Sequence, residues 1–229
     1  MRRKKSAAQA VIDLGALTLK FARVDRITNH EDGVTPESDT DHTVMLGLVA
    51  CAYAARYATH LDIGKIAQYA LIHDLVEVYA GDTPTLTKVP WDKKKKHERE
   101  MRALKRIQKE FSKTLPWIPT TIARYESLKD PEARFVKTMD KIMPTITHFL
   151  NNGKTLKKYG YTPQEHKIDL NNQRSLAMAH YAYDQKEALK IYGEVRSILY
   201  DMLIKELASP QSKKIQSKKS RQGKFKKRR

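Results

Sequence analysis

The chain has 229 residues, of which 40% are hydrophobic, so one domain with extensions can bury a core without disulfides. Its one cysteine, Cys51, excludes an intrachain disulfide, and the apolar run over 44–55 is too short to cross a bilayer. The net charge of +18 is uneven, because residues 209–229 hold 10 Lys or Arg and no acid.

Helical periodicity dominates the chain, and strand signals are weak throughout. In chain order, it predicts helices over 7–21, 40–59 and 63–79, with a polar loop over 25–39 between the first two. It then predicts helices over 92–111, 120–128, 131–150 and 163–207, the last broken near 169–172. There is no internal repeat. We therefore expect an all-α domain over 1–208.

Residues 209–229 are too polar and too charged to fold alone, and we expect a disordered basic tail. Two roles stay open for it: non-specific binding of nucleic acid or another acidic surface, and simple solubilisation. The basic residues Arg2 to Lys5 are not followed by an apolar signal region, which argues against secretion. We expect a cytoplasmic protein with no membrane partner.

The stretch ALIHDLVEVYAGDTPT, residues 70–85, places ionisable side chains among apolar ones. On a regular helix His73 and Glu77 are four residues apart, and Asp74 and Glu77 three apart, so all three would project toward one side. Burying such groups without partners is costly. A metal ion is the partner that best suits an imidazole beside a carboxylate, although a capping or core role would explain His73 and Asp74 taken alone.

Two further residues lie on inward-facing helix positions. His42 lies in the first turn of the helix predicted over 40–59, on the same side as its apolar residues. Asp140 lies between Val136 and Met143, within or beside an apolar stripe, so its carboxylate should be paired, protonated or metal-bound. Pro144 clashes with the carbonyl four residues earlier, which predicts a kink at Asp140.

The candidate ligands therefore offer two nitrogen and two oxygen donors: His42, His73, Asp74 and Asp140. This mixture suits one divalent transition metal ion, such as Co, Mn, Fe, Ni or Zn, better than Mg or Ca.

The order of these residues resembles that of the HD-domain metal-dependent phosphohydrolase superfamily, and within it the 5′-deoxynucleotidases most. The resemblance rests on four stretches in the same order: ARVDR (22–26), PESDTDH (36–42), HDLVEVYAGDTPT (73–85) and YESLKDPEARFVKTMDK (125–141). It implies an HD-domain helical bundle in which His42, His73, Asp74 and Asp140 bind the metal.

The resemblance also implies roles for other residues. Glu77 would be the general acid-base group, although it could instead orient a metal ligand, and Arg23 would contact the phosphate unless it pairs locally. Asp82, also a catalytic candidate, would lie with Thr83 at the sugar side of the pocket. The chain departs from the family pattern at Val24, where an aromatic residue often follows the arginine, and its loop over 29–37 looks longer.

We therefore expect a 5′-deoxynucleotidase that acts on a deoxynucleotide substrate and forms a homo-oligomer, a dimer in the simplest case. A deoxynucleoside triphosphate triphosphohydrolase, such as a viral dATP triphosphohydrolase of HD type, is the alternative. A further alternative is a nucleic-acid-binding protein with a residual HD fold. One metal site and one arginine favour a single terminal phosphate, and the Lys93–Lys96 run is interpreted as solvent-facing.

Overall fold

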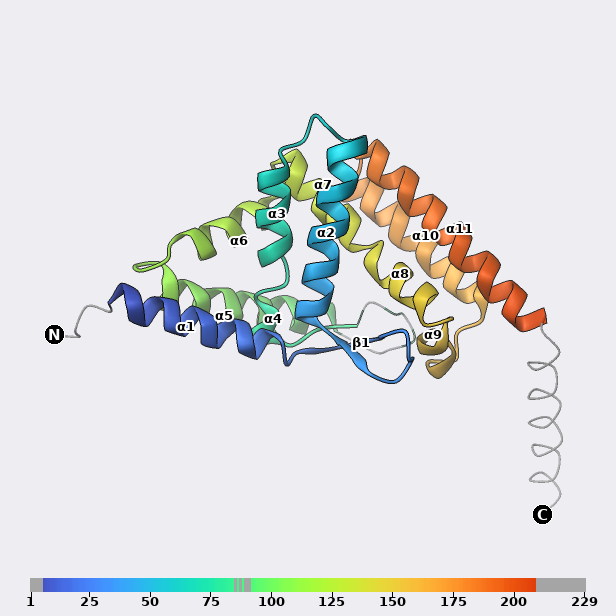
Figure 1. The fold of residues 1–229 in the computed structure, drawn as a ribbon, viewed down its shortest axis with the longest axis horizontal. Helices are drawn as coiled ribbons and strands as arrows, with labels where there is room; N and C mark the ends of the chain where they lie inside the picture. The colour runs from blue at the N-terminus through green and yellow to red at the C-terminus, as the bar shows by residue number, and fades with distance from the viewer. Residues whose placement is uncertain (1–5, 85, 87, 89–91, 209–229) are drawn as a thin grey trace, which may run out of the picture.

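A computed structural model describes residues 6–84, 86, 88 and 92–208 of the chain (Figure 1). The tail predicted over 209–229 lies outside these residues. Helices make up most of the described structure, which confirms the all-α expectation, and a short hairpin is added to them. No helix within the described ranges is long and apolar enough to cross a membrane.

The elements follow one another from the N-terminus as labelled in Figure 1. The first half contains α1 (Ala7–Phe21), β1 (Asp25–Asn29), β2 (Pro36–Ser38), α2 (Asp39–Tyr57), α3 (Ile63–Ile72), α4 (Glu77–Ala80) and α5 (Lys93–Phe111). The second half contains α6 (Trp117–Ser127), α7 (Pro131–Asp140), α8 (Met143–Leu150), α9 (Lys154–Lys158), α10 (Pro163–His180) and α11 (Lys186–Ala208).

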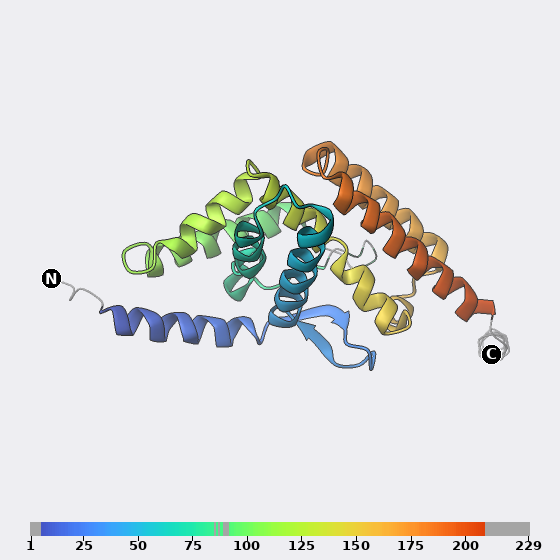
Figure 2. The ribbon, with the colours of Figure 1, turned by 45° about the horizontal axis from the view of Figure 1, so that its top comes forward.

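The centre of the molecule is formed by α2, α3 and α7. α3 packs against both α2 and α7, and these three helices bury Leu46, Ile66 and Met139 in one apolar cluster. The α10–α11 pair covers one end of this centre, and α1, α5 and α6 lie toward the other end (Figures 1 and 2). Because the central helices also carry the metal-ligand candidates, the core holds those residues in place.

The segment predicted as a loop over 25–39 contains a two-stranded antiparallel hairpin instead. Asp25 lies opposite Ser38 and Asn29 opposite Pro36. In the turn between the strands Gly33 adopts a φ of +74°, and the Asp32 carboxylate accepts hydrogen bonds from the backbone amides of Val34 and Thr35. The strands are short and polar, so they lack the apolar alternation by which a strand is recognised in sequence.

Polar contacts fasten this hairpin to the far end of the chain. The Asn29 backbone amide donates to Thr155 Oγ1 of α9 at 3.2 Å, and Asn151 Nδ2, at the end of α8, donates to the Asn29 carbonyl at 2.9 Å. Lys154 Nζ donates to the Asp32 carbonyl at 2.8 Å. The hairpin is therefore clamped by residues more than 100 positions away in the sequence.

The helix predicted over 63–79 ends early, at Ile72, and resumes as α4. Between them the amides of Leu75 and Glu77 bond the carbonyls three residues earlier, Ile72 and Asp74, instead of four residues earlier. These bonds form tight turns in place of a regular helix. The expectation that His73, Asp74 and Glu77 project from one helix is therefore wrong, and a turn brings them together.

The helix predicted over 131–150 divides into α7 and α8 at the position where Pro144 predicts a kink, since α7 ends at Asp140. The break predicted near 169–172 is wrong, because α10 continues to His180 and the chain turns back over 181–185. Asparagine costs a helix only about 0.5 kcal/mol relative to alanine, so Asn171 and Asn172 alone do not end it. The short helix α9 was not predicted.

We predict that Ser38→Ala destabilises the protein by about 1 kcal/mol, the usual cost of a lost N-cap. Ser38 and Asp41 form a reciprocal capping box at the start of α2, the helix whose first turn carries His42. Chemical denaturation measures the change in unfolding free energy. Ser175→Ala, at an exposed position inside α10, is the matched control and should leave stability unchanged or slightly higher.

Candidate metal centre

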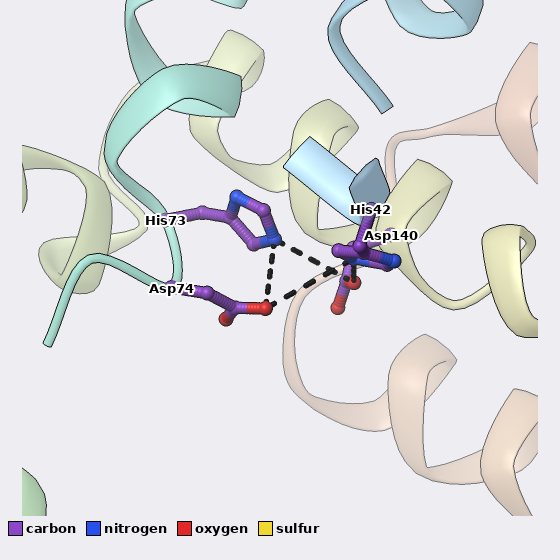
Figure 3. Close-up of side chains that lie close together, drawn as sticks. All are labelled: His42, His73, Asp74 and Asp140. Carbon is purple, nitrogen blue, oxygen red and sulfur yellow. Dashed lines mark hydrogen bonds and ion pairs between the residues drawn. The ribbon is translucent and has the colours of Figure 1, made fainter. Parts of the chain in front are cut away.

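Four side chains from three parts of the fold converge on one point (Figure 3). His42 comes from the first turn of α2, His73 and Asp74 from the turn after α3, and Asp140 from the end of α7. His42 is fully buried, so the expectation that it faces inward is confirmed. The sequence placed these four residues together as ligands, and the structure brings one donor atom of each within 4.8 Å of the others.

The separations within this group match those of ligands around one ion. His42 Nε2 lies 2.9 Å from Asp140 Oδ1, and His73 Nε2 lies 3.0 Å from Asp74 Oδ2. The two cross pairs, His42 with Asp74 and His73 with Asp140, are each 3.9 Å apart. Two donors that each bind one ion at about 2.1 Å can lie at most about 4.2 Å apart, and all four separations satisfy this limit.

The orientation of the two imidazoles also suits a cation. His73 Nδ1 donates to the Ala70 carbonyl at 2.7 Å, which leaves the lone pair on Nε2 directed toward the cluster. Nε2 is buried and faces the other members of the group, with Asp74 Oδ2 at 3.0 Å. His42 Nδ1 faces the buried Glu37 carboxylate at 3.7 Å, and Glu37 itself accepts a hydrogen bond from the Thr28 hydroxyl. Carboxylates in this position commonly orient a metal-binding histidine.

The charges of the group are strongly coupled. Burial lowers the pKa of His42, but its hydrogen bond to Asp140 and the nearby Glu37 carboxylate outweigh burial and raise that pKa to about 9. Burial raises the pKa of Asp140, whereas the neighbouring Lys141 and His42 bring it well below the ordinary range. Asp140 is therefore ionised, as an oxygen ligand of a metal ion must be.

Arg26 of β1 lies beside the ligand group. Its Nη1 atom donates to Asp39 Oδ1 at 2.9 Å and to Asp74 Oδ2 at 3.0 Å. Burial opposes the charge of the guanidinium, but the carboxylates of Asp74 and Asp82 raise the pKa of Arg26 above its ordinary value. A permanent positive charge thus touches one of the metal-ligand candidates.

A second acidic group borders the first: Asp39, Glu77 and Asp82 bring carboxylate oxygens within 4.8 Å of one another. Burial and the charges of Asp74 and Asp82 raise the pKa of Glu77 well above its ordinary value. The Oε2 atom of Glu77 is buried without a hydrogen-bond partner among the described residues. Burial likewise raises the pKa of Asp39, to about 6, and that of Asp82. Burial among other carboxylates therefore favours the neutral form of Glu77.

The structure separates the two arginines of the ARVDR stretch. Arg23, the predicted phosphate contact, is exposed at the end of α1, whereas Arg26 donates to Asp74. The role of Arg26 is not evident in the sequence, because a polar segment expected to be a loop defines no inward face. Thr83, a predicted substrate residue, is buried, and its hydroxyl accepts a hydrogen bond from Arg99 Nη2 of α5 at 2.8 Å.

A cavity of about 440 Å³ opens next to the ligand group. Lys96, Lys137 and Lys141 line it together with Tyr125 and apolar residues of α5 and α6. Lys141 Nζ forms an ion pair with Asp140 at 2.7 Å, a neighbour that sequence adjacency could have revealed. Lys96 lines the cavity too, so the Lys93–Lys96 run is not wholly solvent-facing.

The model of the HD domain family matches residues 18–180, more than half of the chain. The chain belongs to the HD domain family. This confirms the resemblance to the HD-domain superfamily, and the four ligand candidates form a group able to bind a divalent metal ion.

The curated relatives include the 5′-deoxynucleotidase HDDC2 of Bos taurus and of Homo sapiens, each 30% identical over 107 residues. That alignment covers 46% of this chain and 50% of each relative, so the chain spans about half the length of the curated relatives it matches.

Solved structures share the fold. A predicted metal-dependent phosphohydrolase from Magnetospirillum magnetotacticum MS-1 matches with a TM-score of 0.66 and 22% identity, covering 89% of this chain and 99% of that one. A conserved hypothetical protein from Pyrococcus furiosus matches with a TM-score of 0.55 and 23% identity, covering 81% of this chain and 99% of that one.

We predict that His42→Ala and Asp140→Asn each abolish stoichiometric metal binding, because each removes one of four ligands. Glu77→Gln should retain the metal, since Glu77 lies outside the group of four. Elemental analysis of the purified full-length variants after dialysis gives the metal content per chain. Full occupancy in Asp140→Asn would show that the ion binds elsewhere.

Proposed function

We propose that the chain is a 5′-deoxynucleotidase, which hydrolyses deoxynucleoside monophosphates to a nucleoside and inorganic phosphate. The observation that carries the proposal is the combined site: a group of two histidines and two aspartates, a partly buried arginine beside it, and at its edge a glutamate whose pKa is raised. The curated relatives named 5′-deoxynucleotidase support the choice of substrate.

His42, His73, Asp74 and Asp140 would hold the metal, which when bound polarises the phosphoryl oxygens and makes a coordinated water more acidic. Arg26 is placed to neutralise charge on the phosphate oxygens, since it adjoins Asp74 and its fork of donors suits such oxygens. Lys141, which pairs with Asp140 at the cavity wall, supplies a second cation.

Glu77 is placed to donate the proton that the leaving 5′-oxygen requires. Its raised pKa favours the acid form, and it lines the same cavity as His73, Asp74 and Asp140. We expect Glu77→Gln to reduce turnover by roughly 100-fold or more while retaining the metal. A steady-state assay on the metal-loaded full-length variant measures this change, and full activity would remove Glu77 from the mechanism.

The two neighbouring arginines provide a matched pair of variants. Arg26→Gln should lower kcat/KM for a deoxynucleoside monophosphate by roughly 10-fold to 100-fold, because a charged hydrogen bond contributes about 1.5–3 kcal/mol. Arg23→Gln should leave it nearly unchanged, since Arg23 is exposed. If Arg23→Gln lowered kcat/KM more than Arg26→Gln did, Arg23 would be the residue that contacts the phosphate.

A second candidate function, deoxynucleoside triphosphate triphosphohydrolase, is favoured by one observation. Lys96, Lys137 and Lys141 all line the cavity, and a triphosphate chain needs several such cations. Lys96 also forms an ion pair with Glu100 at 3.4 Å, which reduces the charge that it offers to a ligand. We therefore keep the monophosphate as the proposed substrate.

Product analysis distinguishes the two reactions. We predict that metal-loaded protein releases inorganic phosphate from deoxynucleoside monophosphates with a higher kcat/KM than it shows for the triphosphates. Mass spectrometry of incubations with the four mono- and four triphosphates identifies each product. Release of intact tripolyphosphate at the higher kcat/KM would replace the proposed function by the second one.

Other expectations from the sequence stay predictions: the homodimer, the cytoplasmic location, the division into a domain over 1–208 and a tail over 209–229, and the affinity of that tail for nucleic acid. Asp82 and Thr83 likewise stay proposed substrate neighbours. Asp82 adjoins Glu77 and Asp39 within the second acidic group.

A further inference from the structure

The antiparallel helices α10 and α11 lie side by side at one end of the molecule (Figures 1 and 2). Near the turn that joins them, Ala177, Ala182 and Leu189 form a small apolar cluster. Further from the turn lies a polar stretch, in which mostly exposed polar and charged residues such as Lys167 and Arg174 border the two helices.

A groove of about 620 Å³ runs along this polar stretch. His166 and Arg174 line it from α10, eight residues apart and therefore on one face of that helix, and Gly193, Arg196 and Tyr200 line it from α11. A Cβ atom on Gly193 would meet no other atom within 4 Å, so the glycine borders open space. The volume falls within the range of roughly 300–1,000 Å³ found for small-molecule sites.

Two side chains in the wall of the groove carry nitrogen atoms that have no hydrogen-bond partner among the described residues. His166 is 4% exposed, and neither of its ring nitrogens has a hydrogen-bond partner within the described ranges. Arg196 Nε is buried and likewise unpaired there, although another nitrogen of the guanidinium donates to Asn171. Burial and the nearby charge of Arg174 lower the pKa of Arg196. Buried donors left without acceptors are costly, and a ligand with acceptor oxygens would satisfy them.

We infer that this groove is a second binding site, which takes a phosphorylated small molecule of nucleotide size. Lys167, Arg174 and Arg196 bring three positive charges to it, against the one carboxylate of Asp201 in its lining. An arginine side chain often binds a phosphate group through two parallel hydrogen bonds.

The side chain of Tyr200 supplies an aromatic surface for a planar ring of the ligand. Lys167 Nζ lies 4.4 Å from the centre of the Tyr200 ring. No described residue lines both this groove and the cavity at the metal centre, so the two sites are distinct. The inference does not depend on which phosphate ester the metal centre hydrolyses. α11 packs against α7 and α8. The site therefore adjoins α7, the helix that ends at Asp140.

Isothermal titration calorimetry of the full-length, metal-loaded protein tests the inference. The probe is the 5′-phosphonate analogue of deoxyadenosine monophosphate, in which a methylene group replaces the bridging oxygen and prevents hydrolysis. We expect two binding events per chain, of which Asp140→Asn removes the one at the metal centre. If the metal centre does not bind this probe, one event should remain, and Asp140→Asn should leave it unchanged.

Three variants address the groove. Arg174→Gln and Arg196→Gln should each weaken the event that persists in Asp140→Asn by about tenfold or more, since each removes a charged contact. Gly193→Leu should abolish it by filling the groove without changing any charge. Leucine favours a helix more than glycine does, so this variant is expected to fold. Lys190→Gln removes an exposed charge on the same helix and is the control, with unchanged affinity.

Two results would overturn the inference. One is a single binding event that Asp140→Asn removes and the groove variants leave intact. The other is an affinity that falls equally with Lys190→Gln and survives Gly193→Leu, which would indicate diffuse attraction to a basic surface. Arg174 is exposed, so its variant gives a clear answer even if Arg196→Gln reduces stability.

Discussion

The compensation of buried negative charge is the constraint on which the rest of this site depends. Five carboxylates gather in one region: Asp39, Asp74, Glu77, Asp82 and Asp140. Arg26 offsets two of them directly, and burial among these carboxylates favours the neutral form of Glu77. The remaining charge is what a divalent cation, bound between two imidazoles and two aspartates, would balance. The buried carboxylates therefore explain both the position of Arg26 beside them and the capacity of the site to bind a divalent cation.

The fold meets this constraint by ending helices at the ligands. α3 ends immediately before His73, α7 ends at Asp140, and α2 begins three residues before His42. A helix end leaves the backbone free to turn, so side chains from three helices can point at one centre without distorting the helices. The regular parts of the same helices supply the apolar core that holds these ends in position.

The sequence predicted most of the helices and all four proposed ligands, because both depend on local patterns. α1 was predicted residue for residue, and the break at Asp140 followed from Pro144 alone. What the sequence did not reveal depends on contacts between distant segments. The role of Arg26 requires the hairpin, and the hairpin is polar and clamped by α8 and α9, so no short-range pattern marks it.

That clamp also determines how much of the chain a working catalytic unit needs. The last proposed metal ligand is Asp140, and a boundary drawn there would retain every ligand. Yet the hairpin that carries Arg26 and Glu37 is secured by Asn151, Lys154 and Thr155. A fragment that stops at the end of α7 would keep the four proposed metal ligands. It would lose the residues of α8 and α9 that hold the hairpin in place. The minimal functional unit therefore extends beyond the last proposed metal ligand, at least to the end of α9.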